Sequence, residues 1–74
     1  MNLRNLSVLA YSNGFTLWHY RTDEDDMQTV HGDDYFEDAR DCLGDGDMIM
    51  ARASGMSRVL TVNKDRVSIT TDSI

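Results

Sequence analysis

Residue types that can carry out catalysis occur in this chain, but none forms a recognisable catalytic motif. His19 is a candidate general base, but no serine or cysteine nucleophile with a partner motif lies near it in the sequence. The only cysteine, Cys42, lies between Asp41 and Leu43, and acidic neighbours disfavour the thiolate that a nucleophile needs. We interpret His19 as a packed or interface histidine and Cys42 as a small buried apolar residue. No enzymatic activity is expected.

Metal binding is the second chemistry that the residue types allow. Acidic clusters at Asp23–Asp26, Asp33-Asp34 and Asp45-Gly46-Asp47 could offer oxygen ligands to calcium. None fits the twelve-residue calcium loop, which needs acids at its first, third and fifth positions, glycine at the sixth and glutamate at the twelfth. Two histidines and one cysteine also fall short of zinc-ligand spacing. We interpret these clusters as solvated surface and, for the last, as a turn, and we expect no metal or other cofactor.

Length and charge narrow the classes of function further. A chain of 74 residues forms one small β-rich domain, 1–74, with a core that gives marginal stability. Because one cysteine cannot form an internal disulfide, association with other subunits is the remaining means of stabilisation. Thirteen acidic and seven basic residues give a net charge of −6, so nucleic acid would be repelled. The chain has no apolar run of about 18 residues and no signal-peptide pattern, so we expect synthesis in the cytosol and no membrane partner.

The elements that must position a functional surface begin with a hairpin. Asn13-Gly14 favours a two-residue type I′ turn. The flanking segments 6–11 and 15–20 are rich in the β-branched and aromatic residues that favour strands. The pairs that this turn predicts are Ser12 with Phe15, Ala10 with Leu17, and Val8 with His19.

Both faces of this predicted hairpin are apolar. One face carries Val8, Ala10, Phe15 and Leu17, and the other carries Leu9, Tyr11, Trp18 and Tyr20. An antiparallel hairpin on the surface of a monomer usually has one polar face, and a chain of this length can hardly cover two apolar ones. Tryptophan and tyrosine are also enriched at the energetic centres of interfaces. We therefore predict a contact surface for another subunit, composed of Leu9, Tyr11, Phe15, Trp18, His19 and Tyr20.

The rest of the chain predicts one short helix and three strands. Asp34 and Glu37 form an aspartate variant of the capping box, and an apolar stripe of Phe36, Ala39 and Leu43 follows. Gly44 or Gly46 would end this helix. The three predicted strands are 48–53, 58–63 and 66–71, joined by turns at Ser54-Gly55 and at 63–65. This order indicates a mainly β (α+β) fold: a small antiparallel β-sandwich or partly open barrel of about five strands with one short helix at one end.

Three parts of the sequence resemble a known group of proteins. They are the string from Leu6 to Tyr20, in which Asn-Gly-Phe-Thr-Leu-Trp-His-Tyr is the most specific part, then Tyr35-Phe36 and Gly46-Asp47-Met48-Ile49. Together they resemble small proteins encoded in the structural-gene regions of tailed bacteriophages and prophages. The resemblance spans about two-thirds of the chain. It implies a non-catalytic virion component, with capsid decoration (cement) as the particular role.

This resemblance sets the expected partners and leaves alternatives open. A cement protein implies self-association, with cyclic trimers at local threefold axes as one solution, and binding to the major capsid protein in the virion. No nucleic acid or membrane partner is expected. One alternative is an acidic cytosolic regulator that mimics the charge of DNA and inhibits a nucleic-acid enzyme. Another is a head-to-tail or tail component of the same particle.

Overall fold

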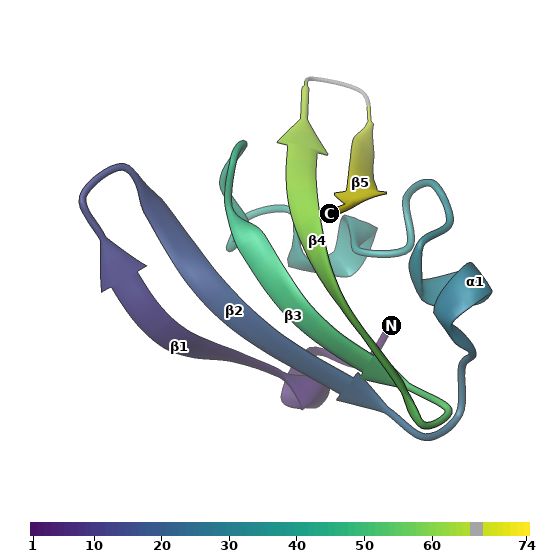
Figure 1. The fold of residues 1–74 in the computed structure, drawn as a ribbon. Helices are drawn as coiled ribbons and strands as arrows, with labels where there is room; N and C mark the ends of the chain where they lie inside the picture. Colours follow the sequence, from purple (N-terminus) through teal and green to yellow (C-terminus); the bar gives the residue numbers. More distant parts are fainter. Residues whose placement is uncertain (66–67) are drawn as a thin grey trace.

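The computed structural model describes residues 1–65 and 68–74, whose strands form one five-stranded sheet (Figure 1). The strands are β1 (Leu6–Ser12), β2 (Phe15–Thr22), β3 (Met48–Ala53), β4 (Met56–Lys64) and β5 (Ile69–Ser73). Their order in the sheet is their order in the chain. The helical segments are α1 (Met27–Val30) and the two 3-10 turns η1 (Leu3–Asn5) and η2 (Glu37–Ala39). A mainly β small domain with five strands and one short α-helix is therefore confirmed.

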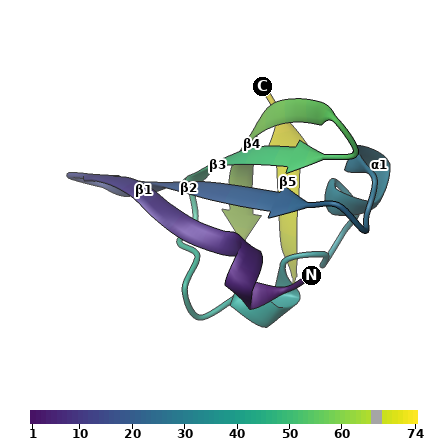
Figure 2. The same ribbon diagram turned by 90° about the horizontal axis from the view of Figure 1, so that it is seen from below.

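The sheet is mixed, whereas the sequence analysis predicts an antiparallel one. β2 and β3 run parallel, in register from Leu17 opposite Met48 to Thr22 opposite Ala53, and the other neighbours are antiparallel. Parallel neighbours need a crossover of a dozen or more residues, and 23–47 supply it. The described strands form one curled sheet that is not closed into a barrel, rather than the two sheets of a sandwich (Figure 2).

The core lies on the side of the sheet that faces α1 and η2 (Figure 2). β3 shows the alternation that this requires, because Ile49, Ala51 and Ala53 are buried while Met50 is 43% exposed. The crossover closes this side with Val30 from α1 and the predicted apolar stripe around η2. The largest fully buried side chains include Tyr20, Phe36, Leu43, Ile49, Leu60 and Ile69.

The segment predicted as a helix from Asp34 contains only the 3-10 turn η2. Asp34 is not an N-cap, because its φ is 62° and its side chain bonds to β5 instead. The predicted core stripe is nevertheless right, since Phe36, Ala39 and Leu43 are all buried. Cys42, expected to be buried, is exposed, because the tighter turn does not bring it to the core side.

The only described α-helix, α1, lies where the sequence analysis identifies no helix. Asp26 is its N-cap, and its carboxylate accepts a hydrogen bond from the Thr29 N–H at 2.8 Å. Met27 and Val30, one turn apart, are its two buried residues. A helix of four residues is too short to show a recognisable helical repeat of apolar residues in the sequence.

The two predicted hairpin turns differ in type. Ser54 and Gly55 both have positive φ, 49° and 79°, as the type I′ turn between β3 and β4 requires. In the β1–β2 turn Gly14 has a φ of 107°, but Asn13 is not among the residues with positive φ. The predicted type I′ turn at Asn13-Gly14 is therefore wrong, although the turn itself is where it was expected.

The register of the β1–β2 hairpin changes at a bulge. Ser12 pairs with Phe15 and Ala10 with Leu17, as predicted. The register then shifts between Val8 and Ala10, so that Val8 lies opposite Trp18 rather than His19.

The remaining strand boundaries are close to those predicted. β3 has the predicted limits, and β4 extends the predicted strand at both ends. The turn predicted at 63–65 is therefore wrong for Asn63 and Lys64, which pair with β5. The first two residues of the predicted strand 66–71 lie outside the described residues, and β5 ends two residues later than predicted.

Candidate functional site

β1 is an edge strand with almost no cover. Its residues are exposed apart from Leu6, with Val8 55%, Leu9 53% and Tyr11 79% exposed. Only β2 pairs with it, so every second residue directs its N–H and C=O away from the sheet. Large apolar side chains and unpaired backbone groups thus lie together along the exposed β1 edge of the sheet.

The tip of the β1–β2 hairpin stands clear of the rest of the sheet. Pairing between β2 and β3 begins only at Leu17, so β1 is the only described strand that pairs with the residues before it. Figures 1 and 2 show the turn reaching beyond β3, on the side away from α1. A two-stranded extension of this kind gains little from the core of its own chain.

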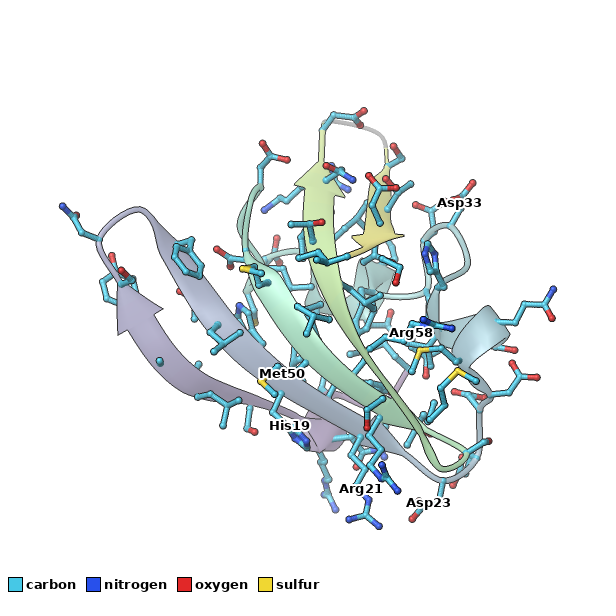
Figure 3. The ribbon with its side chains drawn as sticks, in the orientation of Figure 1. His19, Arg21, Asp23, Asp33, Met50 and Arg58 are labelled. Carbon is cyan, nitrogen blue, oxygen red and sulfur yellow. The ribbon has the colours of Figure 1, made fainter. Side chains whose placement is uncertain are left out.

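The face of the sheet opposite the core is also uncovered among the described elements (Figure 2). On this face His19 pairs with Met50, and Met50 pairs with Val59 across to β4. Figure 3 labels His19 and Met50, which lie next to each other on β2 and β3. A hollow of about 300 Å³ lies here, lined in part by His19, Met50, Val59 and Ile74.

Trp18 and Tyr20 lie on the core side of β2, which corrects their assignment to an outward apolar face. Tyr20 is 1% exposed in the single chain and belongs to the core, and Trp18 is half-buried and packs against it. The bulge places Val8 opposite Trp18, so the two faces are not composed as predicted. Of the six predicted interface residues, Leu9 and Tyr11 lie on the exposed edge strand and Phe15 and His19 on the uncovered face.

Asp47 fixes the hairpin to the crossover. Its carboxylate accepts hydrogen bonds from the Thr16 N–H at 2.9 Å, the Trp18 Nε1–H at 3.0 Å and the Gly44 N–H at 2.8 Å. Burial raises the pKa of Asp47, but these three donors and the positive charge of Lys64 outweigh it and hold the pKa below its usual value. This residue was predicted as part of a turn, and the structure shows that its side chain also links that turn to β2.

A second polar cluster lies beside the buried ring of Tyr20. The Tyr20 and Tyr35 hydroxyls are 2.8 Å apart, and the Tyr35 hydroxyl donates to the carboxylate of Asp25. Burial and the hydrogen bonds to Asp25 and Tyr20 raise the pKa of Tyr35 well above its usual value. Tyr20, Tyr35 and Phe36 also contact one another edge to face. These three aromatic side chains therefore pack against one another within a single chain.

Charge is segregated along the chain, a signal that the total charge alone does not reveal. Residues 1–22 contain two arginines and no acid, so all thirteen acids lie after residue 22 together with the other five basic residues. β1, β2, β3 and β4 contain no acidic residue at all. The exposed hairpin is therefore free of acidic residues in a chain of net charge −6, and the described strands bring one acid to the uncovered face, Asp72 of β5, whose carboxylate accepts a hydrogen bond from the Asn63 side chain.

A hollow of about 540 Å³ lies between α1 and the β3–β4 turn. Its lining includes Met27, His31, Met56 and Arg58. Figure 3 shows Arg58 on the α1 side and Arg21 beside Asp23, to which it makes an exposed ion pair at 3.8 Å. Among the described residues no three histidine, cysteine or acidic side chains are grouped as a metal site.

Comparisons with protein-family models, with curated proteins and with solved structures give no match to this chain. Within the described residues, no helix has the length and apolar character needed to cross a membrane. The functional assignment therefore depends on the exposed β1–β2 hairpin, whose strands contain no acidic residue.

Acid is expected to destabilise the fold through Asp47 and Asp26. Both carboxyls have a lowered pKa, Asp26 because the Thr29 N–H donates to it. Their stabilising effect is therefore full above the unfolded value of about 3.9, and it is lost as the pH falls from there through the folded pKa. Urea titrations should show a decreasing free energy of unfolding from about pH 5 to about pH 2. Asp47→Asn should make the free energy of unfolding fall less steeply with decreasing pH. An unchanged pH dependence in this variant would contradict the lowered pKa of Asp47.

Proposed function

We propose that this protein is a non-catalytic structural component of a phage virion, a capsid decoration (cement) protein that self-associates and binds the capsid surface. The observation that carries this proposal is the edge strand β1, which exposes Val8, Leu9 and Tyr11 and is paired on one side only. Exposed apolar surface of this kind marks an interaction site. The resemblance to proteins from phage structural-gene regions supports the proposed location in a virion.

The distribution of charge supports a role in assembly. A decoration protein must stay soluble when it is made in the host cytoplasm and must adhere through one defined surface. The acids of this chain lie outside β1 to β4, so the soluble and the adhesive parts are separate. Self-association and contact with the major capsid protein would both use carboxylate-free surface, and cyclic trimers are one arrangement that fits a capsid threefold axis.

The structure gives the DNA-mimic alternative less support. A mimic presents its acids as a free array along one face, whereas many acids here bind backbone or side-chain donors. These acids are Asp25, Asp26, Asp34, Asp45, Asp47, Asp65 and Asp72. A head-to-tail or tail component shares the proposed virion setting and would use the same hairpin.

Mass spectrometry of purified virions tests the proposed function. Particles of the phage or induced prophage that carries the gene are banded in a density gradient, washed at high salt and quantified against the major capsid protein. We expect this chain to co-purify at a copy number comparable with that of the capsid protein. A head-to-tail or tail component would be present at a few copies per particle.

Two controls make the result decisive. An abundant non-structural phage protein should be lost during the washes, which shows that retention is specific. Absence of this chain from particles, together with its recovery on a host nuclease or polymerase, would favour the regulator instead.

A further inference from the structure

The turn between β1 and β2 contains an asparagine followed by a glycine, a pair prone to a spontaneous reaction of the backbone. In this reaction the glycine nitrogen attacks the side-chain carbonyl carbon of the asparagine, and glycine permits the close approach because it has no Cβ. Asparagine is accordingly one of the thermolabile residues of proteins. Asn13-Gly14 is the only such pair in the chain. Whether it reacts depends on how the fold holds the two groups.

The β1–β2 turn leaves both reacting groups free. Asn13 and Gly14 are exposed, and among the described residues neither the Asn13 side-chain amide nor the Gly14 N–H makes a hydrogen bond. Apart from its two chain neighbours, no atom lies within 4 Å of the place where a Cβ of Gly14 would stand. The turn also stands clear of β3 (Figure 1). Little therefore holds this backbone against the rotation that the attack needs.

The fold engages the corresponding groups of Asp45-Gly46, the one pair in the chain where an aspartate precedes glycine and could close the same ring. The Gly46 N–H donates to the Val62 carbonyl at 2.8 Å, so the attacking nitrogen is occupied. The Asp45 carboxylate accepts a hydrogen bond from the Lys64 N–H at 2.9 Å. Bonds to β4 thus restrain both reacting groups here. The structure distinguishes two pairs that look alike in the sequence.

We propose that Asn13 is a site of spontaneous deamidation, which places a carboxylate at the tip of the acid-free hairpin. The Gly14 nitrogen loses its proton to base and bonds to the side-chain carbonyl carbon of Asn13, and ammonia leaves as a cyclic imide forms. Water then adds to one imide carbonyl and breaks its bond to nitrogen. Opening at the side-chain carbonyl gives aspartate, and opening at the main-chain carbonyl gives isoaspartate. One water is consumed and one ammonia released, without oxidant or reductant.

The product changes the charge of the hairpin. Residues 1–22 contain two arginines and no acid, so one new carboxylate lowers their formal charge from +2 to +1 and that of the chain from −6 to −7. The exposed apolar side chains of Tyr11 and Phe15 lie on the strands that flank it. Isoaspartate also adds one main-chain atom to a two-residue turn, which disturbs the pairing of Ser12 with Phe15. Any effect on association rests on the proposed function, because it takes the hairpin as the contact surface.

Peptide mapping of the full chain, aged at neutral and at mildly alkaline pH, tests the modification. Trypsin cleaves after Arg4 and Arg21, so Asn5 and Asn13 lie in one peptide and are compared in the same spectrum. Each deamidation adds about 1 Da, and heavy-oxygen water labels the new carboxyl group. We expect Asn13 to react at least about tenfold faster than Asn5, which precedes leucine, and its rate to increase with pH. Asn13→Gln, whose longer side chain disfavours ring closure, should stay unmodified.

The unfolded chain separates the structural inference from the sequence motif. Aging in guanidinium chloride removes the fold and gives the intrinsic rate of each pair. Asn13 should react in the folded chain at more than about a tenth of its unfolded rate, and folding should slow the isomerisation of Asp45 more strongly, as electron-transfer fragmentation can show. A lower folded rate at Asn13, equal protection of the two pairs, or a rate no faster than that of Asn5 would overturn the proposal.

Two stable variants test the consequence for association. Asn13→Asp carries the new charge and Asn13→Ser does not, and matching circular dichroism melts would show that both are folded. Sedimentation velocity should give Asn13→Asp a self-association constant weaker by at least about threefold than that of Asn13→Ser. Equal constants would overturn this consequence and count against the hairpin as the contact surface. The modification would then still stand on the peptide map, and virion association on its own measurement.

Discussion

Replacing Asp47 with alanine should lower the free energy of unfolding by about 3 to 5 kcal/mol, which is typical when one partner of a buried charged network is removed. The change leaves the Thr16 N–H, the Trp18 indole N–H and the Gly44 N–H without their acceptor. Domains of this size have a total stability at the lower end of about 5 to 15 kcal/mol. We therefore expect Asp47→Ala to be mostly unfolded at moderate temperature.

Asp45→Ala is the matched control for this prediction. Asp45 lies two residues away and accepts one exposed hydrogen bond, from the Lys64 N–H at 2.9 Å. Its removal should cost about 1 kcal/mol or less. Urea unfolding followed by tryptophan fluorescence measures both variants, since Trp18 is the only tryptophan. Equal losses would show that the Asp47 carboxylate has no special role in joining β2 to the crossover.

Replacing Tyr20 with alanine should also lower the free energy of unfolding by about 3 to 5 kcal/mol, because it removes a fully buried ring. The loss includes the edge-to-face contacts with Tyr35 and Phe36 and the hydrogen bond between the two tyrosine hydroxyls. Thermal and urea unfolding measure it. Tyr20→Phe keeps the ring and should lose about 1 kcal/mol, the value of its hydroxyl bonds.

Tyr11→Ala is the control that separates the core from the proposed surface. Tyr11 is 79% exposed, so its loss should change the monomer's stability by no more than about 0.5 kcal/mol. If the hairpin is the proposed contact surface, this variant weakens association instead. A large loss of stability in Tyr11→Ala, or a small one in Tyr20→Ala, would mean that the hairpin's two tyrosines had been assigned the wrong roles.

The strands and turns could be predicted because their signals are local. β3 follows from a run of apolar residues that ends at Ser54-Gly55, and the β1–β2 hairpin follows from Asn13-Gly14 between two β-rich segments. The stripe of Phe36, Ala39 and Leu43 identified core residues even though its helix was wrong, since a tight turn can bury the same three side chains. Patterns of this kind depend on neighbours along the chain.

The failures concern contacts between distant residues. The neighbouring residues in the sequence do not indicate that Asp34 bonds to Ile69 instead of capping a helix. They also do not indicate that β3 lies parallel to β2. The bulge at Leu9 likewise has no sequence signal, yet it moves Val8 opposite Trp18 and changes which side chains share a face.

The exposure of the hairpin could be predicted in part, but the composition of its two faces could not. The hairpin was identified from its excess of apolar residues, and Leu9 and Tyr11 are exposed as an interface would require. Tyr20 was assigned to the predicted contact surface because the alternation of side chains along a strand does not show which face of the strand the rest of the chain covers. The crossover covers the face of Trp18 and Tyr20, and Met50 and Val59 join the other face only through strand pairing.

The separation of charge along the chain has a kinetic consequence. Residues 1–22 have a formal charge of +2 and the remaining residues −8, which together give the chain's −6. The molecule is thus an electric dipole, with its carboxylate-free end at the hairpin. If copies associate as proposed, they repel through their acidic parts as they approach and are turned so that the hairpins meet first. Added salt shortens the range of this repulsion, so encounters become more frequent as ionic strength rises, opposite to the behaviour of partners that attract through opposite charges.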